Sequence, residues 1–118
     1  MIRWVGSSRK DLRRFPREAR RDIGAALDAA QLGEMDPSAR PLRGFGGASV
    51  IEIRAAFRTD AYRAVYTVRF GEAIYVLHAF QKKSTRGIAT PKTEIEVIEA
   101  RLRQAEEIYR MVQESERE

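Results

Sequence analysis

The sequence of 118 residues contains no cysteine and only one histidine, His78. The lack of cysteine excludes disulfide frameworks, thiolate zinc sites and cysteine nucleophiles, and it fits a reducing compartment such as the cytoplasm. A single histidine also argues against most transition-metal sites. We therefore expect a cytoplasmic protein that uses neither a metal ion nor another cofactor.

Long apolar runs are absent as well. None approaches the roughly 20 residues that a membrane-spanning helix needs, and Arg3 and Gly6 interrupt the N-terminal run that a signal peptide would need. Nucleotide-binding glycine loops are also missing, because the glycines of 44–47 precede a predicted strand and no Gly-Lys-Ser/Thr motif follows them. The length predicts a single domain, residues 1–118, that is soluble and has no membrane partner.

Charged residues are abundant, and they are unevenly distributed along the chain. The formal net charge is +5. Residues 1–21 contain eight Lys or Arg and two acidic residues, whereas residues 94–118 contain four Lys or Arg and eight acidic residues. A basic segment favours contact with nucleic acid or with an acidic protein, although the same residues could simply form a solvated helix face.

Three helices are predicted from apolar periodicity and from capping signals. Ser8 and Asp11 resemble a capping box, so a short helix is expected directly after Ser8. Pro16 separates it from a second helix that ends near Leu32. The last helix starts at Pro91, where a threonine precedes the proline.

Strands are predicted between the second and the third helix. Residues 34–47 are rich in glycine and proline and predict a long loop. Residues 49–58 alternate apolar and polar side chains, which predicts a half-buried strand. Residues 62–70 and 73–82 follow as two further strands of an antiparallel meander, and the last of them is apolar on both faces, so we expect it to be covered on both sides. A short run at residues 2–5 could add an edge strand, which makes the fold class α+β.

Every strand of the meander supplies cations, namely Arg54, Arg58, Arg63, Lys82 and Lys83. Antiparallel folding can bring these side chains together, and Arg and Lys from separate segments form a cluster suited to phosphate. Taken singly, each of them could instead be an exposed cation or pair with Glu52 or Asp60.

His78 lies within an apolar strand and has two interpretations. It is either a structural residue that is hydrogen-bonded to a neighbour or a group that transfers protons, since an imidazole can take up and release a proton near neutral pH. The strand tyrosines are core aromatics by default. A tyrosine at the rim of the sheet, such as Tyr62, could nevertheless stack on a base, and the loop residue Arg43 offers a partner another cation.

Several of these motifs occur together in a fixed order: Glu52-Ile53-Arg54, Tyr62-Arg63, the run Tyr75-Val76-Leu77-His78-Ala79-Phe80-Gln81-Lys82-Lys83, and Thr90-Pro91 followed by Glu94-Ile95. In this order the chain resembles the RelE/ParE superfamily of toxin-antitoxin toxins, and most closely its HigB-like, phage-derived branch. The resemblance covers most of the chain. It implies two N-terminal helices packed on a small, mostly antiparallel sheet, with a C-terminal helix. It also implies a metal-independent, ribosome-dependent mRNA endoribonuclease (mRNA interferase) that inhibits translation.

The same resemblance implies roles for individual residues. Arg63 corresponds to the sheet arginine that contacts the scissile phosphate, Arg54 to a basic position on the preceding strand, and Lys82 or Lys83 to the cation near the end of the last strand. The tyrosine that some RelE-type toxins carry after that strand is absent here, since Thr90-Pro91 stands in its place, so the resemblance does not identify the acid or base. In the nuclease hypothesis, His78 or a tyrosine would transfer protons. The predicted RNA-binding residues are Arg58, Tyr62, Arg86 and Arg43.

The implied partners are a helix-turn-helix antitoxin (HigA-like), the ribosome with its mRNA, and operator DNA only through the antitoxin complex. The alternative is a binding module without catalysis, since the superfamily also contains gyrase inhibitors and a fold alone does not separate the two. The lack of an unambiguous acid-base pair favours that alternative. For the nuclease, we expect an Arg63→Ala variant to remain folded and to lose toxicity.

Overall fold

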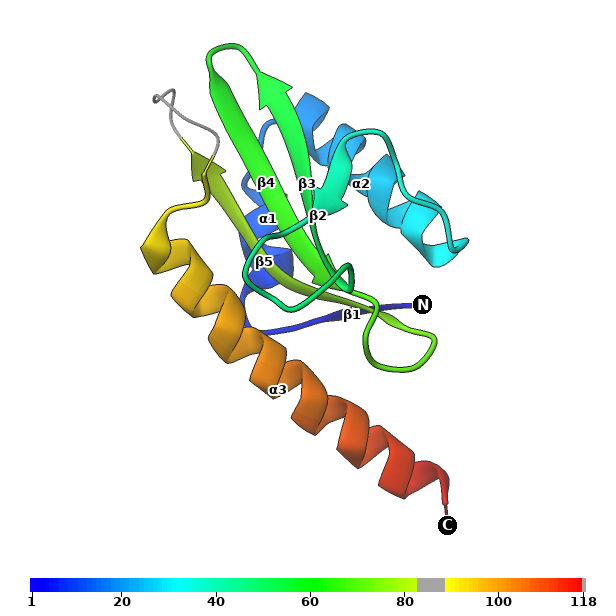
Figure 1. The fold of residues 1–118 in the computed structure, drawn as a ribbon. Coiled ribbons are helices and arrows are strands. Elements are labelled where there is room, and N and C mark those ends of the chain that lie inside the picture. The colour runs from blue at the N-terminus through cyan, green and yellow to red at the C-terminus, as the bar shows by residue number, and fades with distance from the viewer. Residues whose placement is uncertain (83–88, 118) are drawn as a thin grey trace.

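The computed structural model describes residues 1–82 and 89–117, which form an α+β fold of five strands and three helices (Figure 1). The elements are β1 (Ile2–Trp4), α1 (Ser8–Arg13), α2 (Arg17–Gln31), β2 (Ala39–Pro41), β3 (Val50–Phe57), β4 (Asp60–Thr67), β5 (Ile74–Lys82) and α3 (Lys92–Glu116). The strands form one sheet in the order β1-β5-β4-β3-β2. Only β1 runs parallel to its neighbour, so the sheet is mixed.

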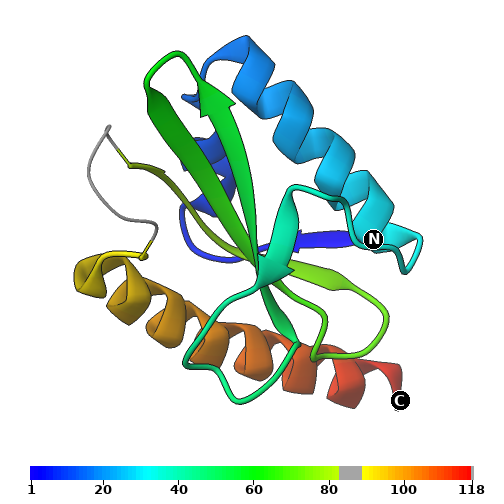
Figure 2. The same ribbon diagram turned by 45° about the horizontal axis from the view of Figure 1, so that its top comes forward.

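The two faces of the sheet are covered by different helices, with α1 and α2 on one side and α3 on the other (Figure 2). Successive side chains of a strand point to opposite faces of the sheet, so each strand contributes to a core on both sides. Ile53 and Tyr66 belong to the core under α1 and α2, whereas Val65 and Leu77 belong to the core under α3. Residues 74–80 of β5 are all buried, which confirms that this strand is covered on both faces.

The helices bury the stripes that their apolar spacing predicts. In α2, Ala19, Ile23 and Leu27 face the sheet at intervals of four residues. In α3, Ile98 and Ala105 are fully buried, seven residues apart. None of the described helices is long and apolar enough to cross a membrane.

The start of α1 differs from the predicted capping box. The helix begins at Ser8, but the cap position is Ser7, and its side chain makes no capping hydrogen bond. Ser7 Oγ instead donates to Asp11 at 2.7 Å, and Ser8 Oγ donates to the backbone oxygen of Val76 at 3.0 Å. The second serine therefore ties α1 to β5 and does not cap the helix.

The predicted strand count and boundaries also need correction. The expected loop of residues 34–47 contains β2, which pairs with β3 and adds a fifth strand. The turn between β3 and β4 is shorter than expected, with Arg58 in the left-handed region at φ 58°, so β4 starts at Asp60. Strand β3 is not half-buried, because its first four residues are all buried, including Glu52, which is 6% exposed and accepts a hydrogen bond from Thr90.

A β-bulge changes the alternation of β5. Val65 pairs with His78 and Tyr66 pairs with Val76, so Leu77 is an extra residue opposite β4. Leu77 and His78 therefore both face α3, and the His78 ring stacks on Phe80 with their centroids 5.1 Å apart. The distal half of β5 thus presents His78 and Lys82 to the α3 side, whereas Gln81 pairs with Tyr62 on the other face.

Candidate functional site

The basic cluster, here defined as Arg54, Arg63 and Lys82, lies on the α3 side of the sheet. Arg54 is directly opposite Arg63 in the β3–β4 register, and Lys82 pairs with Ala61, two positions before Arg63 on β4. The pKa of Lys82 is lowered by partial burial and then by the positive charges of Arg63 and Arg54. Burial and the charge of Arg63 likewise lower the pKa of Arg54. The predicted convergence of these three cations is therefore present in the fold.

Arg63 lies at the bottom of the cluster and is only 2% exposed. Its Nη1 donates to Glu52 Oε1 at 3.3 Å and to Thr90 Oγ1 at 3.3 Å. Thr90 Oγ1 in turn donates to Glu52 Oε2 at 2.8 Å. Arg63 is thus buried and does not lie on an exposed surface, and the alternative that it pairs with Glu52 is confirmed. Its role in a reaction stays a prediction.

Arg54 and Lys82 form the more accessible part of the cluster, since both side chains are half-buried. Lys82 Nζ donates to the backbone oxygen of Ala89 at 2.6 Å, which connects the end of β5 to the residues before α3. An ammonium with a lowered pKa gives up its proton more readily than an ordinary lysine. This position can therefore both attract an anion and supply a proton.

Arg40 is a further cation that the sequence analysis did not place at the site. It lies on β2, pairs in register with Glu52, and is exposed. Its charge also lowers the pKa of Arg54, after the larger effects of burial and Arg63. A strand of three residues is too short to show a periodicity, so the sequence around Arg40 predicts a loop.

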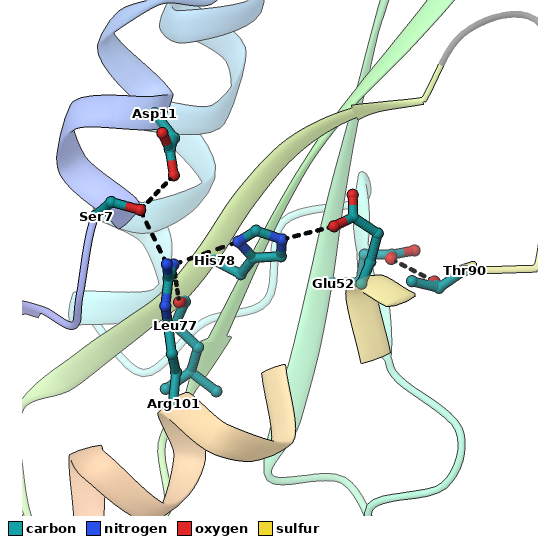
Figure 3. A network of polar contacts seen from close by, with 8 residues as sticks. Ser7, Asp11, Glu52, Leu77, His78, Thr90 and Arg101 are labelled. Carbon is teal, nitrogen blue, oxygen red and sulfur yellow. Dashed lines mark hydrogen bonds and ion pairs between the residues drawn. The ribbon is translucent and has the colours of Figure 1, made fainter. Parts of the chain in front are cut away.

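His78 is 7% exposed and has a partner at each ring nitrogen. Nε2 lies 3.1 Å from Glu94 Oε1, and Nδ1 lies 3.3 Å from Nη1 of Arg101, with Arg101 extending to Ser7 (Figure 3). Both partners belong to α3. This geometry favours the structural interpretation of His78 over a free proton carrier.

Tyr62 is separated from the cluster by the sheet. It is 8% exposed and packs against Phe15 on the α1 and α2 side, with ring centroids 5.0 Å apart. Its position in β4 has the opposite parity to Arg63, so it does not lie beside the cations, and its stacking on a base stays a prediction. Burial raises the pKa of Tyr66 and of Tyr75, so neither hydroxyl is suited to release a proton near neutral pH.

The other predicted RNA-binding residues lie at the periphery. Arg58 is exposed at the β3–β4 turn, with its guanidinium 5.3 Å from the centroid of the Phe57 ring. Arg43 is exposed in the segment between β2 and β3. Lys83 and Arg86 lie outside the described residues. Among residues 1–82 and 89–117, no three His, Asp or Glu side chains are grouped to hold a metal ion.

Residues 10–112 match a protein family described as phage derived protein Gp49-like (DUF891). The matched segment contains the whole basic cluster together with Glu52, His78, Glu94 and Arg101. No curated protein matches the chain.

Proposed function

The chain belongs to the Gp49-like family of phage-derived proteins, and from this premise we propose that it is the toxin of a type II toxin-antitoxin system. The family is associated with RelE-type toxins. We further propose that the toxin is HigB-like and cleaves mRNA on the ribosome, in the cytoplasm. The observation that carries this proposal is the convergence of Arg54, Arg63 and Lys82 from three strands on one side of the sheet.

The charges of the cluster support binding of a phosphate group. Arg40, Arg54 and Lys82 are exposed or half-buried, while Glu52 is occupied by Arg63 and Thr90. A phosphodiester that approaches the cluster therefore meets mainly positive charge. Arginine can bind two phosphate oxygens at once, and lysine acts as a point charge.

In the proposed reaction, the 2′-hydroxyl of one nucleotide attacks the adjacent phosphorus atom. The bond between phosphorus and the 5′-oxygen breaks, which leaves a 2′,3′-cyclic phosphate and a 5′-hydroxyl. Arg54 stabilises the charge that develops on the phosphate oxygens. Lys82 donates a proton to the leaving 5′-oxygen, for which its lowered pKa is suited. The proton of the attacking hydroxyl passes to solvent, and no metal ion takes part.

The test is cleavage of mRNA on translating ribosomes, with new RNA ends mapped by primer extension. We expect cleavage by the wild type and by Arg103→Met, since Arg103 is an exposed residue of α3. We expect greatly reduced cleavage by Arg54→Met and by Lys82→Met. Intact mRNA after incubation with folded wild-type protein and active ribosomes would overturn the proposal.

We also propose a helix-turn-helix antitoxin of the HigA type as a partner, with operator DNA contacted only through that complex. Exposed cations on α1 and α2 support contact with an acidic surface: Arg9, Lys10, Arg13, Arg17, Arg20 and Arg21. Co-purification with the product of the neighbouring reading frame tests this partnership. A neighbouring product that neither binds the chain nor relieves its toxicity would count against it.

A second candidate function is a binding module without catalysis, either a gyrase inhibitor or an inactive relative that binds an antitoxin. The burial of Arg63 and the two occupied nitrogens of His78 favour this candidate. A supercoiling assay with purified gyrase separates the two functions, because inhibited supercoiling together with uncut mRNA supports the binding module.

A further inference from the structure

Arg101 of α3 is placed against the only histidine of the chain (Figure 3). Its Nη1 donates to the backbone oxygen of Leu77 at 3.1 Å and lies 3.3 Å from Nδ1 of His78, and its Nη2 donates to Ser7 Oγ at 2.9 Å. We propose that Arg101 is a positioning residue. It holds His78 in one neutral tautomer and thereby fixes the start of α3 above the basic cluster.

The tautomer follows from what a guanidinium can do. Every nitrogen of Arg101 carries hydrogen and none can accept a hydrogen bond, so Nδ1 of His78 must be the acceptor and bears no proton. In the neutral ring the proton is then on Nε2, which donates to Glu94 Oε1 at 3.1 Å. A proton on Nδ1 would place two donors and two positive charges 3.3 Å apart.

The contact reaches the candidate site through the first turn of α3. Glu94, which accepts from His78, lies four residues after Thr90, which bonds to the Glu52 partner of Arg63. The two strands on either side of β4 thus hold the same helix start, β5 through His78 and β3 through Glu52. When the contact of Arg101 with His78 is intact, Thr90 stays over the Glu52–Arg63 pair.

Gly6 provides an independent sign that the position of Arg101 is built into the fold. A Cβ atom at Gly6 would lie 2.6 Å from Nε of Arg101, and the residue has a positive φ of 56°. The N-terminal segment therefore leaves room for the guanidinium immediately before Ser7 accepts its hydrogen bond. Any side chain at this position would displace Arg101 from Ser7 and His78.

The experiment is imidazole ¹⁵N NMR, which is unambiguous because the chain has one histidine. In the wild type at pH 7.5 we expect one set of signals, with Nε2 protonated and Nδ1 unprotonated. Gly6→Ala and Arg101→Met should both move the Nδ1 signal. Two matched controls should leave it unchanged: Arg103→Met, an exposed arginine of the same helix, and Gly33→Ala, which has a positive φ of 80° but no atom within 4 Å.

A signal for Nδ1–H in the wild type, or an Nδ1 signal that neither Gly6→Ala nor Arg101→Met moves, would overturn the proposal. If Arg101→Met does not fold, the wild-type spectrum still shows which ring nitrogen of His78 carries the proton, and Arg101→Lys takes the place of the methionine variant. Amide exchange adds a second measurement. The Glu94 amide should lose protection in Arg101→Met and keep it in Arg103→Met.

The effect on RNA rests on the proposed function. If the wild type cleaves mRNA, Arg101→Met should cleave roughly 10–100-fold more slowly, as expected when a catalytic geometry is displaced by about 1 Å. Full activity in a folded Arg101→Met variant with a changed tautomer would refute the positioning role. An inactive wild type would refute the nuclease assignment alone, since the tautomer is measured without RNA.

Discussion

The two faces of the sheet use the same strands but differ in what they bury. Among the described residues, the face under α1 and α2 buries a core of apolar and aromatic side chains. The face under α3 also buries Glu52, Arg63 and His78. The first face is stabilised mainly by removing apolar area from water, and the second depends on specific partners for its polar groups. On the second face His78 is therefore hydrogen-bonded to α3, and Glu52 and Arg63 are bonded to Thr90, just before that helix.

The largest effect should come from breaking the ion pair on the α3 face. Arg63→Met leaves Glu52 buried without its cation, so we expect the free energy of unfolding in urea to fall by about 3–5 kcal/mol. The double variant Arg63→Met/Glu52→Leu should recover most of this loss. If Arg63→Met is as stable as the wild type, the α3 face does not depend on specific partners for its buried polar groups, and the two faces do not differ in what stabilises them. The expectation that Arg63→Ala remains fully folded conflicts with this burial.

The variant Arg54→Met tests whether the accessible cations of the α3 face take part in mRNA cleavage. Arg54→Met should reduce mRNA cleavage by roughly 10²-fold, the usual cost of removing one group that stabilises a developing anion. Its urea midpoint should stay close to that of the wild type, because the side chain is half-buried. Equal loss of activity in Arg103→Met would mean that the effect reflects overall charge and not this face.

The pH dependence of cleavage tests Lys82. If its ammonium donates the proton, activity should fall as the pH rises through its pKa, which lies below the ordinary lysine value of 10.5 because of burial and of Arg63 and Arg54. Lys82→Arg should move this fall to higher pH, since a guanidinium keeps its proton. The measurement is the single-turnover rate at several pH values with ribosomes checked for activity at each. An unchanged profile in Lys82→Arg would remove this lysine from the proton transfer.

The apolar face should respond to lost volume alone. Ile53→Val removes one methylene group from a residue with no exposed surface, so we expect a loss of about 0.5–1.5 kcal/mol in the urea experiment. Cleavage at a temperature where the variant is folded should match that of the wild type. Reduced cleavage in the folded variant would indicate that the two faces are coupled through β3.

The smallest effect is expected at the tip of the β3–β4 turn, where the covered faces end. Arg58→Asn places a residue that tolerates the left-handed region at φ 58°, but it removes the contact with the Phe57 ring. These effects oppose each other, so stability should change by less than about 1 kcal/mol. Thermal unfolding measures this change. A loss of cleavage as large as that of Arg54→Met would extend the site to the turn.

The fold was largely predictable because its main signals are local. The apolar stripe of α2 and the alternation in β3 and β4 define these elements without tertiary information. Strand β2 was missed because three residues carry no pattern, and their pairing with β3 fixes them. The mixed character of the sheet was not evident from sequence either, since the parallel pairing of β1 with β5 joins residues far apart in the chain.

The candidate site was only partly predictable. The strand order brought Arg54, Arg63 and Lys82 together as expected, because antiparallel neighbours share a register. Burial could not be inferred in the same way. Whether Arg63 faces solvent or Glu52 depends on where α3 starts, and Thr90 reaches Glu52 across 38 positions of sequence. Arg101 carried no recognisable signal, because on a helix rich in charge it resembles any solvated arginine.

The extra residue in β5 has a consequence for how this surface could change during evolution. Because Leu77 and His78 both face α3, deleting Leu77 would restore simple alternation after Val76 and leave His78 and Lys82 on the α3 side. Straightening the strand with Leu77 retained would instead turn His78 and Lys82 toward α1 and α2, and Ala79 and Gln81 toward α3. A relative with a regular strand of the same length would therefore keep the same letters in its sequence and present a different surface to its partners.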